Sequence, residues 1–378
     1  MALAESDTGM DITNREEDEW WSGKRIVTIG GGTGPFALLS SLKRYPCSIT
    51  AVVTMADSGG SSRRLMDEFG QLPFGDLRQA LVALSRKGVL WRDVFTYRFR
   101  QGNGSRNGAA NGGGHAVPAP EGDPSASHAS RVAAQAGVSG HSLGNLIISA
   151  LQEINDGDLL LAVQDAQELL DTAGDVLPVT LDHATLCAEI EGGETICGET
   201  EIDTRGERCR DALPPIQRIF LREPCTACPQ SIRAIRRADT IIIGPGDLYT
   251  SILPNLLVNG IAQAIRESEA EIVYVCNLMT KHGETDNFRA SDFVREVQRY
   301  LGGPIDRVIL HDGSFPEHLL GAYAEQQQHP VIPDVDVVQE LVPHVEVDRL
   351  IAIGQDHFVR HDPARLVRAA FAPRLRDV

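Results

Sequence analysis

The chain has 378 residues, 42% of them apolar, a formal net charge of −17 and seven cysteines. This length suffices for one large α/β core or two smaller ones. The acidic balance argues against nucleic acid and a membrane surface as partners, since no broad basic surface is available to replace phosphate counterions. No apolar stretch is long enough to span a bilayer, so we expect no membrane insertion and a cytoplasmic location.

The acidic N-terminal segment and the cysteines each lead to a prediction from composition. Residues 1–23 are acidic and lack hydrophobic periodicity, which predicts a disordered tail, with Trp20 and Trp21 docking just before the first strand. Cys225 and Cys228 have zinc-knuckle spacing, but no second Cys or His pair accompanies them. An odd number of cysteines in such a chain predicts ordinary reduced thiols without a disulfide framework.

The first ordered motif is residues 24–35, KRIVTIGGGTGP, where an apolar run stops in glycines and a threonine. The pattern predicts a buried strand, a tight turn and a helix with Pro35 at its first position. We name residues 30–34 the glycine turn. Its bare N–H groups and the positive end of the helix dipole suit a phosphate or diphosphate. It fits the loose dinucleotide pattern G-x-G-x-x-A and lacks the Gly-Lys-Ser/Thr of ATPase loops. A tight connection without a ligand is the alternative.

A second apolar strand at 49–55 completes a right-handed βαβ unit. Residues 56–62, ADSGGSS, follow it as a serine loop, where a dinucleotide dehydrogenase would pass directly into a helix. Two loops suited to an anion, at the ends of neighbouring strands, indicate a ligand with several oxygen atoms. Asp57 could hold a divalent metal such as Mg²⁺ or a ligand hydroxyl, and a flexible surface loop is the alternative. Asp76 is placed to cap the next helix.

The middle of the chain contains two departures from the α/β pattern. Residues 101–138 are Gly, Asn, Ala, Ser and Pro with almost no large apolar side chains, which predicts a flexible, disordered insertion. Residues 140–145, GHSLGN, then begin a helix and offer amides, a hydroxyl and a carboxamide to an anion or sugar, or simply cap the helix. Residues 176–204 predict a β-hairpin excursion at a sheet edge.

The α/β alternation resumes with an apolar strand at 240–243, which ends in residues 244–251, GPGDLYTS. We name residues 244–250 the proline loop. The next strands, at 272–276 and 307–310, also end in polar loops. In an open parallel sheet such loops share one edge, and ligands bind there. Polar loops after five strands are therefore stronger evidence for a ligand than any single motif.

These elements predict an α/β, Rossmann-like fold with a mostly parallel sheet and helices on both faces, plus the hairpin excursion and the disordered insertion. We expect a single domain over residues 24–375 that contains the insertion at 101–138 and the hairpin at 176–204. The sequence leaves the oligomeric state open, including a homo-oligomer, and does not identify a protein partner.

Seven motifs in order, GGGTG, ADSGGSS, PFGDLRQALVALS, GHSLGN, GPGDLYTSILPNLLV, VYVCNLMTKHGETD and VRHD, resemble the YvcK group of gluconeogenesis factors, within the wider CofD-like family. The likeness covers roughly residues 24–100 and 139–375. It implies a Rossmann-like cytoplasmic protein that binds uridine diphosphate sugars, notably the N-acetylglucosamine form. It also implies a link to gluconeogenic carbon metabolism, cell-envelope synthesis and cell shape.

The same resemblance supplies a rival function. CofD is a 2-phospho-L-lactate transferase that uses a guanosine diphosphate-activated lactyl group, so the rival is a Mg²⁺-dependent phospholactyl or phosphoryl transferase. The family loop usually reads Asp-Asp-Gly-Gly-Ser-Ser, whereas this chain has Asp57 and Ser58. Because one carboxylate orients Mg²⁺ poorly, the change weakens the transferase hypothesis. No catalytic base or nucleophile can be named, which favours a binding protein over an enzyme. A nicotinamide dehydrogenase fits the glycine turn but not the serine loop.

The resemblance also places selectivity near the C-terminus. Tyr323 would stack its ring on the ligand, and Arg360 would offer its guanidinium to the diphosphate. A tyrosine packed on its neighbours and an arginine paired with Asp362 are the alternatives. The full set of residues expected to contact nucleotide or phosphate is Gly31, Gly32, Thr33, Gly34, Ser58, Gly59, Gly60, Ser61, Ser62, Asn145, Gly244, Gly246, Tyr249, Thr250, Asn277, Tyr323 and Arg360, with Asp57 as the metal ligand.

Overall fold

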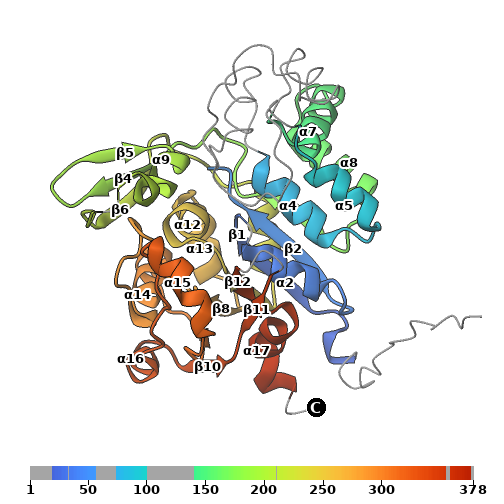
Figure 1. The fold of residues 1–378 in the computed structure, drawn as a ribbon. Helices are drawn as coiled ribbons and strands as arrows, with labels where there is room; N and C mark the ends of the chain where they lie inside the picture. Colours follow the sequence, from blue (N-terminus) through green and yellow to red (C-terminus); the bar gives the residue numbers. More distant parts are fainter. Residues whose placement is uncertain are drawn as a thin grey trace, which may run out of the picture.

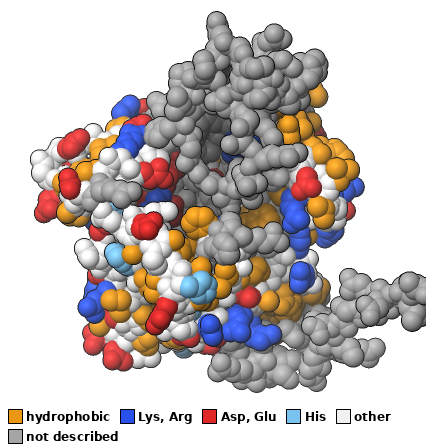
Figure 2. Space-filling view, viewed as in Figure 1, with side chains coloured by type: hydrophobic (Ala, Val, Ile, Leu, Met, Phe, Trp, Pro, Cys, Tyr) orange, Lys and Arg blue, Asp and Glu red, His pale blue; other side chains and the backbone are white. Residues whose placement is uncertain are grey.

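The computed structural model describes residues 19–32, 34–56, 74–99, 140–209, 211–354 and 358–375. The expected insertion at 101–138, residues 1–18 of the acidic tail and most of the serine loop lie outside these residues. Among the residues described, no helix is both long and apolar enough to cross a membrane. On the face shown in Figure 2, acidic and basic side chains are interspersed around apolar ones.

A seven-stranded sheet forms the centre of the molecule (Figure 1). Its strand order is β10-β9-β8-β7-β1-β2-β3, and every neighbouring pair is parallel. The strands are β1 (Arg25–Gly30), β2 (Ser48–Val53), β3 (Asp175–Pro178), β7 (Thr240–Ile243), β8 (Glu271–Val275), β9 (Arg307–His311) and β10 (His344–Asp348). All four residues of β7 are buried, as is typical of a parallel strand covered on both faces. The predicted Rossmann-like α/β fold is confirmed.

Helices cover both faces of this sheet. Val27 and Thr50 border α8 (Leu159–Leu170) and α11 (Pro229–Arg237), whereas Thr28 and Ala51 border α2 (Gly34–Leu42) and α4 (Gly75–Leu84). Neighbouring residues of one strand point to opposite faces, so these two helix pairs lie on opposite sides. The other helices include α5 (Val89–Thr96), α7 (Leu143–Ile154), α9 (Glu199–Asp203), α10 (Arg205–Arg208), α12 (Leu253–Leu257), α13 (Ile261–Arg266), α14 (Ala290–Leu301), α15 (Glu317–Glu325), α16 (Val335–Leu341) and α17 (Pro363–Leu375).

An aromatic cluster fixes the start of the described chain. Trp21 is fully buried, and its ring centroid lies 4.5 Å from those of Tyr45 and Phe371. Aromatic rings at this separation bury a large apolar area and gain from edge-to-face contact. Trp21 therefore docks before β1 as expected, and the tail boundary at residue 23 is wrong because residues 19–23 belong to the fold.

The expected hairpin excursion also begins later than predicted. Residues 175–178 form β3, the edge strand of the main sheet. The excursion is a separate antiparallel sheet of order β5-β4-β6, made of β4 (Leu186–Ile190), β5 (Thr195–Cys197) and β6 (Ile216–Leu221). The sequence pattern found the β4–β5 hairpin but not its third strand, because β6 is separated from it by α9 and α10. A further pair, β11 (Ile351–Ile353) and β12 (Val359–His361), is antiparallel.

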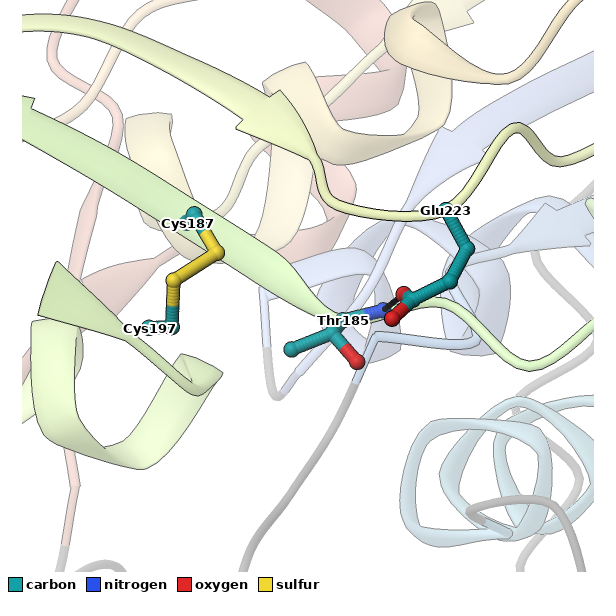
Figure 3. Close-up of a disulfide and its surroundings, with 4 residues drawn as sticks. All are labelled: Thr185, Cys187, Cys197 and Glu223. Carbon is teal, nitrogen blue, oxygen red and sulfur yellow. Dashed lines mark hydrogen bonds between the residues drawn. A yellow bond between two sulfur atoms is a disulfide. The ribbon is translucent and has the colours of Figure 1, made fainter. Parts of the chain in front are cut away.

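One disulfide crosses the small sheet. Cys187 and Cys197 lie directly opposite each other on β4 and β5 and are bonded, with their Cα atoms 4.1 Å apart (Figure 3). Nearby, Thr185 N donates a 3.3 Å hydrogen bond to Glu223 Oε2. The expectation of reduced thiols throughout is wrong for this pair, because strand pairing brings together two cysteines whose sequence spacing carries no disulfide signal.

The zinc-knuckle cysteines are instead packed thiols. Cys225 Sγ lies 3.5 Å from the carbonyl oxygen of His183, and Cys228 Sγ lies 3.3 Å from Gln230 Oε1. Both are buried, and neither belongs to a metal-binding group among the residues described. Burial also raises the pKa of the Cys225 thiol, so it stays protonated near neutral pH.

Reducing the disulfide should lower stability. Cys187 and Cys197 close a loop with a sequence separation of 10, for which loop-closure entropy predicts about 2–3 kcal/mol. Thermal unfolding of the wild type should therefore shift downward on adding reductant. The C187A/C197A variant should not respond to reductant, and Cys209→Ser, which alters a free thiol, should respond like the wild type. An unshifted wild-type transition would show that the pair is not bonded.

Candidate functional site

The candidate site lies at the carboxyl edge of the sheet, between β1 and β7. These strands are neighbours, yet the chain proceeds from β1 to β2 on one side and from β7 to β8 on the other. The point where the strand order reverses leaves a crevice at the carboxyl ends, which is where ligands bind in such sheets. The glycine turn follows β1 and the proline loop follows β7, so the two loops meet at this point.

The two loops pack backbone against backbone. A Cβ atom added at Gly34 would lie 2.2 Å from the carbonyl oxygen of Pro245 and 2.9 Å from Gly246 Cα. A Cβ at Gly246 would lie 3.3 Å from the carbonyl oxygen of Gly31. Gly32 (φ +67°) and Gly244 (φ +82°) occupy the left-handed region that favours glycine. The glycines expected to cradle phosphate are therefore also required to bring the two loops together.

Asp76 is a site residue that sequence reasoning assigned wrongly. It lies in the first turn of α4, whose N-cap is Phe74, so it does not cap the helix. A Cβ at Gly31 would lie 2.3 Å from Asp76 Oδ2, which places the carboxylate against the glycine turn. A carboxylate there suits a ligand hydroxyl or a cation better than a phosphate.

Asn277 holds the proline loop from the end of β8. Its Nδ2 donates a 2.8 Å hydrogen bond to the carbonyl oxygen of Gly246. Its Oδ1 is buried and accepts no hydrogen bond from the residues that the structure describes. The side chain thus spans two adjacent strand ends and keeps one acceptor at the site.

The structure places the side chains of Tyr249 and Thr250 in the core, and their role as ligand contacts stays a prediction. Both are 2% exposed. The Tyr249 ring packs edge-on against Phe288 at 6.5 Å, and Thr250 Oγ1 donates to Asp203 Oδ1 at 3.5 Å. The irregular turn at Leu248–Ile252, a π-helix, carries both side chains into the interior. The sequence showed a polar loop but not which side chains would face inward.

Asn145 is also buried, at 2% exposure. Its Oδ1 accepts a 3.0 Å hydrogen bond from Arg78 Nε, and its backbone N donates to Ser142 Oγ at 3.4 Å. Ser142 is the N-cap of α7. These contacts are those of the capping alternative raised from sequence, and a ligand contact by Asn145 stays a prediction.

Tyr323 supports a strand and does not present a free ring. It is 7% exposed, its OH accepts a 2.7 Å hydrogen bond from Val359 N, and its ring lies edge-on to Phe358 at 6.0 Å. These contacts are those of the packed tyrosine raised as the alternative, and stacking on a ligand stays a prediction. Arg360 follows on β12, opposite Ala352 of β11, and β12 packs beside α2, the helix that starts at the glycine turn. Tyr323 thus fixes the strand that carries Arg360.

The remaining sequence-predicted residues lie outside the described part of the chain. They are Thr33, Asp57, Ser58, Gly59, Gly60, Ser61 and Ser62.

Sequence reasoning missed an ionic cluster beside the proline loop. Lys281 Nζ lies 2.8 Å from Asp247 Oδ2 and 2.9 Å from Glu284 Oε1, and it also pairs with Asp203 Oδ1. The three carboxylates lie close enough together to hold a metal ion. The Lys281 ammonium supplies one positive charge among them, which offsets part of their negative charge. Asp203 comes from α9, far from Lys281 in sequence, and no local motif could have revealed it.

Protonation in this cluster is strongly perturbed. Burial alone would lower the pKa of Lys281, but the carboxylates of Asp247, Glu284 and Asp203 outweigh it and hold that pKa well above its ordinary value. Burial raises the pKa of Glu284 to about 8. The Glu284 side chain is 1% exposed, and its Oε1 is paired with the Lys281 ammonium. The cluster therefore combines a permanent ammonium with a carboxyl group that changes charge near neutral pH.

Comparison with known proteins places this site in a family. Residues 26–351 match the family model described as 2-phospho-L-lactate transferase CofD. The chain belongs to the CofD family. This assignment confirms the resemblance that the motifs indicated.

Two curated relatives of this CofD-family chain are named gluconeogenesis factor. The relative from Halalkalibacterium halodurans is 37% identical over 348 residues, which cover 92% of this chain and 95% of the relative. The relative from Bacillus subtilis is 37% identical over 340 residues, covering 89% and 94%. A crystal structure of a Bacillus halodurans protein superposes with a TM-score of 0.78 at 36% identity, covering 93% of this chain and 100% of that one.

Gly34→Ala should destabilise the protein by about 1–3 kcal/mol or more, because the added methyl would overlap the Pro245 carbonyl. Gly321→Ala is the matched control. It lies within α15 with nothing within 4 Å of an added Cβ, and there alanine should stabilise by about 0.5–1 kcal/mol. Chemical denaturation measures both changes. Equal stability of the two variants would contradict the loop-to-loop packing.

Glu284→Gln should alter the pH dependence of stability. The pKa of Glu284 rises from 4.5 to about 8 on folding, so the folded wild type keeps a proton that the unfolded chain releases within this interval. Wild-type stability should therefore fall as pH rises from about 5 to 8, and Glu284→Gln should remove about 1–3 kcal/mol of that fall. Denaturation at several pH values tests this, with Glu317→Gln as an exposed control. Parallel wild-type and Glu284→Gln profiles would refute it.

Proposed function

We propose that this protein is a nucleotide-sugar-binding regulatory protein of the YvcK type, with a ligand resembling uridine diphosphate N-acetylglucosamine. Its role would link gluconeogenic carbon metabolism to cell-envelope synthesis and cell shape, in the cytoplasm. The observation that carries the proposal is the packing of the glycine turn against the proline loop where the strand order reverses. Curated relatives named gluconeogenesis factor support the regulatory part.

The proposed binding mode follows from this geometry. The diphosphate would lie over the glycine turn, where backbone N–H groups and the start of α2 favour an anion. Arg360, on the strand beside α2, would add a charge-assisted hydrogen bond. Asp76 and the Asn277 Oδ1 acceptor would take hydroxyl groups of the ribose or sugar, because both are acceptors.

The alternative function is a CofD-like transferase, which the family description favours. It would require Mg²⁺, for which we propose Asp57 as ligand, with Asp76 as the nearest described carboxylate at the glycine turn. A binding protein is preferred over a transferase because the thiol at this edge of the sheet is a poor nucleophile. Burial raises the pKa of the Cys276 thiol, which follows β8 at this edge, to about 12, so it is a poor nucleophile.

A ligand panel separates the two functions. Differential scanning fluorimetry and calorimetry with uridine and guanosine diphosphate sugars, free nucleoside diphosphates and NAD(P), each with Mg²⁺ or EDTA, report which ligand stabilises the folded chain. A uridine diphosphate sugar that binds equally in EDTA supports the regulatory protein. A response restricted to a guanosine nucleotide with Mg²⁺ supports the transferase and overturns the first proposal.

Arg360→Ala should weaken binding of the uridine diphosphate sugar by about 1–3 kcal/mol, because a charge-assisted hydrogen bond to the diphosphate is lost. Arg365→Ala is the control, because Arg365 is an exposed arginine on α17 whose Nη1 lies 3.8 Å from Asp348 Oδ1. Calorimetry measures both affinities after circular dichroism has shown that both variants fold. Wild-type affinity in Arg360→Ala would remove Arg360 from the site.

A further inference from the structure

A second cavity lies at the opposite, amino-terminal edge of the sheet. It has a volume of about 470 Å³, and its floor is made by the first residues of β1, β2 and β3. Its walls are α8 and α11. We name it the amino-edge groove. Its volume lies within the range of small-molecule sites, roughly 300–1,000 Å³. The groove begins where β1 starts, whereas the glycine turn lies where β1 ends, so it is separate from the candidate nucleotide site.

Each wall of the groove is one face of a helix. From α8 it receives Leu160, Gln164 and Gln167, and from α11 it receives Gln230, Arg233, Ala234 and Arg237. Both sets follow the spacing of three and four residues that brings side chains onto one helical face. The polar side chains on these faces therefore converge over a floor that includes Val27 and Leu177.

The charge of the groove is opposite to that of the whole chain. Three arginines line it, Arg25, Arg233 and Arg237, against a single carboxylate, Asp175. Arg25 is already paired with Asp239 through two hydrogen bonds of 3.2 and 2.8 Å. The groove thus retains a positive balance in a protein with a net charge of −17.

The side chains of Arg233 and Arg237 form no hydrogen bond or ion pair with the residues that the structure describes. Arg236 on the same helix does, because its NH2 group lies 3.2 Å from Glu267 Oε2. Arg236 and Arg237 both lie in the last turn of α11 and gain from the helix dipole there, whereas Arg233 lies one turn earlier. The dipole therefore does not explain why only the two that face the groove lack an acidic partner. Two like charges one turn apart repel each other unless an anion lies between them.

We propose that the amino-edge groove binds a small organic anion carrying two phosphate or carboxylate groups. Arg233 and Arg237 would each hold one group through the planar guanidinium fork, which matches both oxyanions. The glutamines would bond the remaining oxygens, and the body of the ligand would lie on the apolar floor. The site is distinct from the proposed nucleotide site and takes a different ligand.

Calorimetry with citrate and with inorganic pyrophosphate distinguishes a polycarboxylate from a diphosphate. At least one probe should bind the wild-type chain. Arg233→Gln and Arg237→Gln should each weaken that binding about tenfold or more, the loss expected when a hydrogen bond to a charged group is removed. Arg236→Gln, on the same helix but outside the groove, should bind like the wild type.

Three results would overturn the proposal. These are no binding of either probe at millimolar concentration, binding that persists in the double variant R233Q/R237Q, and equal weakening in Arg236→Gln. Pyrophosphate that binds at the glycine turn instead of the groove would still bind R233Q/R237Q, which is the second of these results. The substituted residues Arg233, Arg236 and Arg237 are exposed on the surface of α11, so the variants should fold. Circular dichroism checks this before binding is compared.

Discussion

The structure depends on the contact between two stretches of backbone, the glycine turn after β1 and the proline loop after β7. At Gly34 the loops approach so closely that a single methyl group would overlap a carbonyl oxygen. Close-packed interiors do not yield easily to such an overlap, so neither loop can take a larger residue there without moving. This contact places the start of α2 beside the end of β7, and it defines the crevice in which a ligand would be held. Asn277 adds a hydrogen bond from a third strand end.

The ionic cluster around Lys281 stabilises the same edge by a different means. Its three acids come from α9, from the proline loop and from the turn after β8, so one ammonium group joins three segments. Lys281 and Glu284 are the most buried members, so removing Lys281 would leave the buried Glu284 without its partner. Because Glu284 loses its proton near pH 8, the charge balance at this edge depends on pH in a way that the phosphate-binding loops alone would not show.

Much of the fold could be predicted from the sequence, because apolar strands and glycine-rich strand ends are local signals. β1, β7 and the meeting of their loops followed from hydrophobic runs and from the rule that parallel strands share a carboxyl edge. Side-chain direction could not be predicted. Tyr249 and Thr250 sit in a loop of polar composition, yet the π-helical turn carries them inward. Asp203 and the pairing of Cys187 with Cys197 depend on tertiary contacts between segments without any recognisable pattern.

The position of β1 inside the sheet, between β7 and β2, constrains the order in which the molecule can assemble. Its neighbour β2 follows within a few dozen residues, but its other neighbour pairs Ile26 with Thr240, more than half the chain later. During synthesis β1 therefore has one edge unpaired until β7 is made, and an exposed strand edge invites pairing with other chains. Trp21 becomes buried later still, because its ring packs against Phe371. Contacts this distant in sequence favour slow folding of the chain.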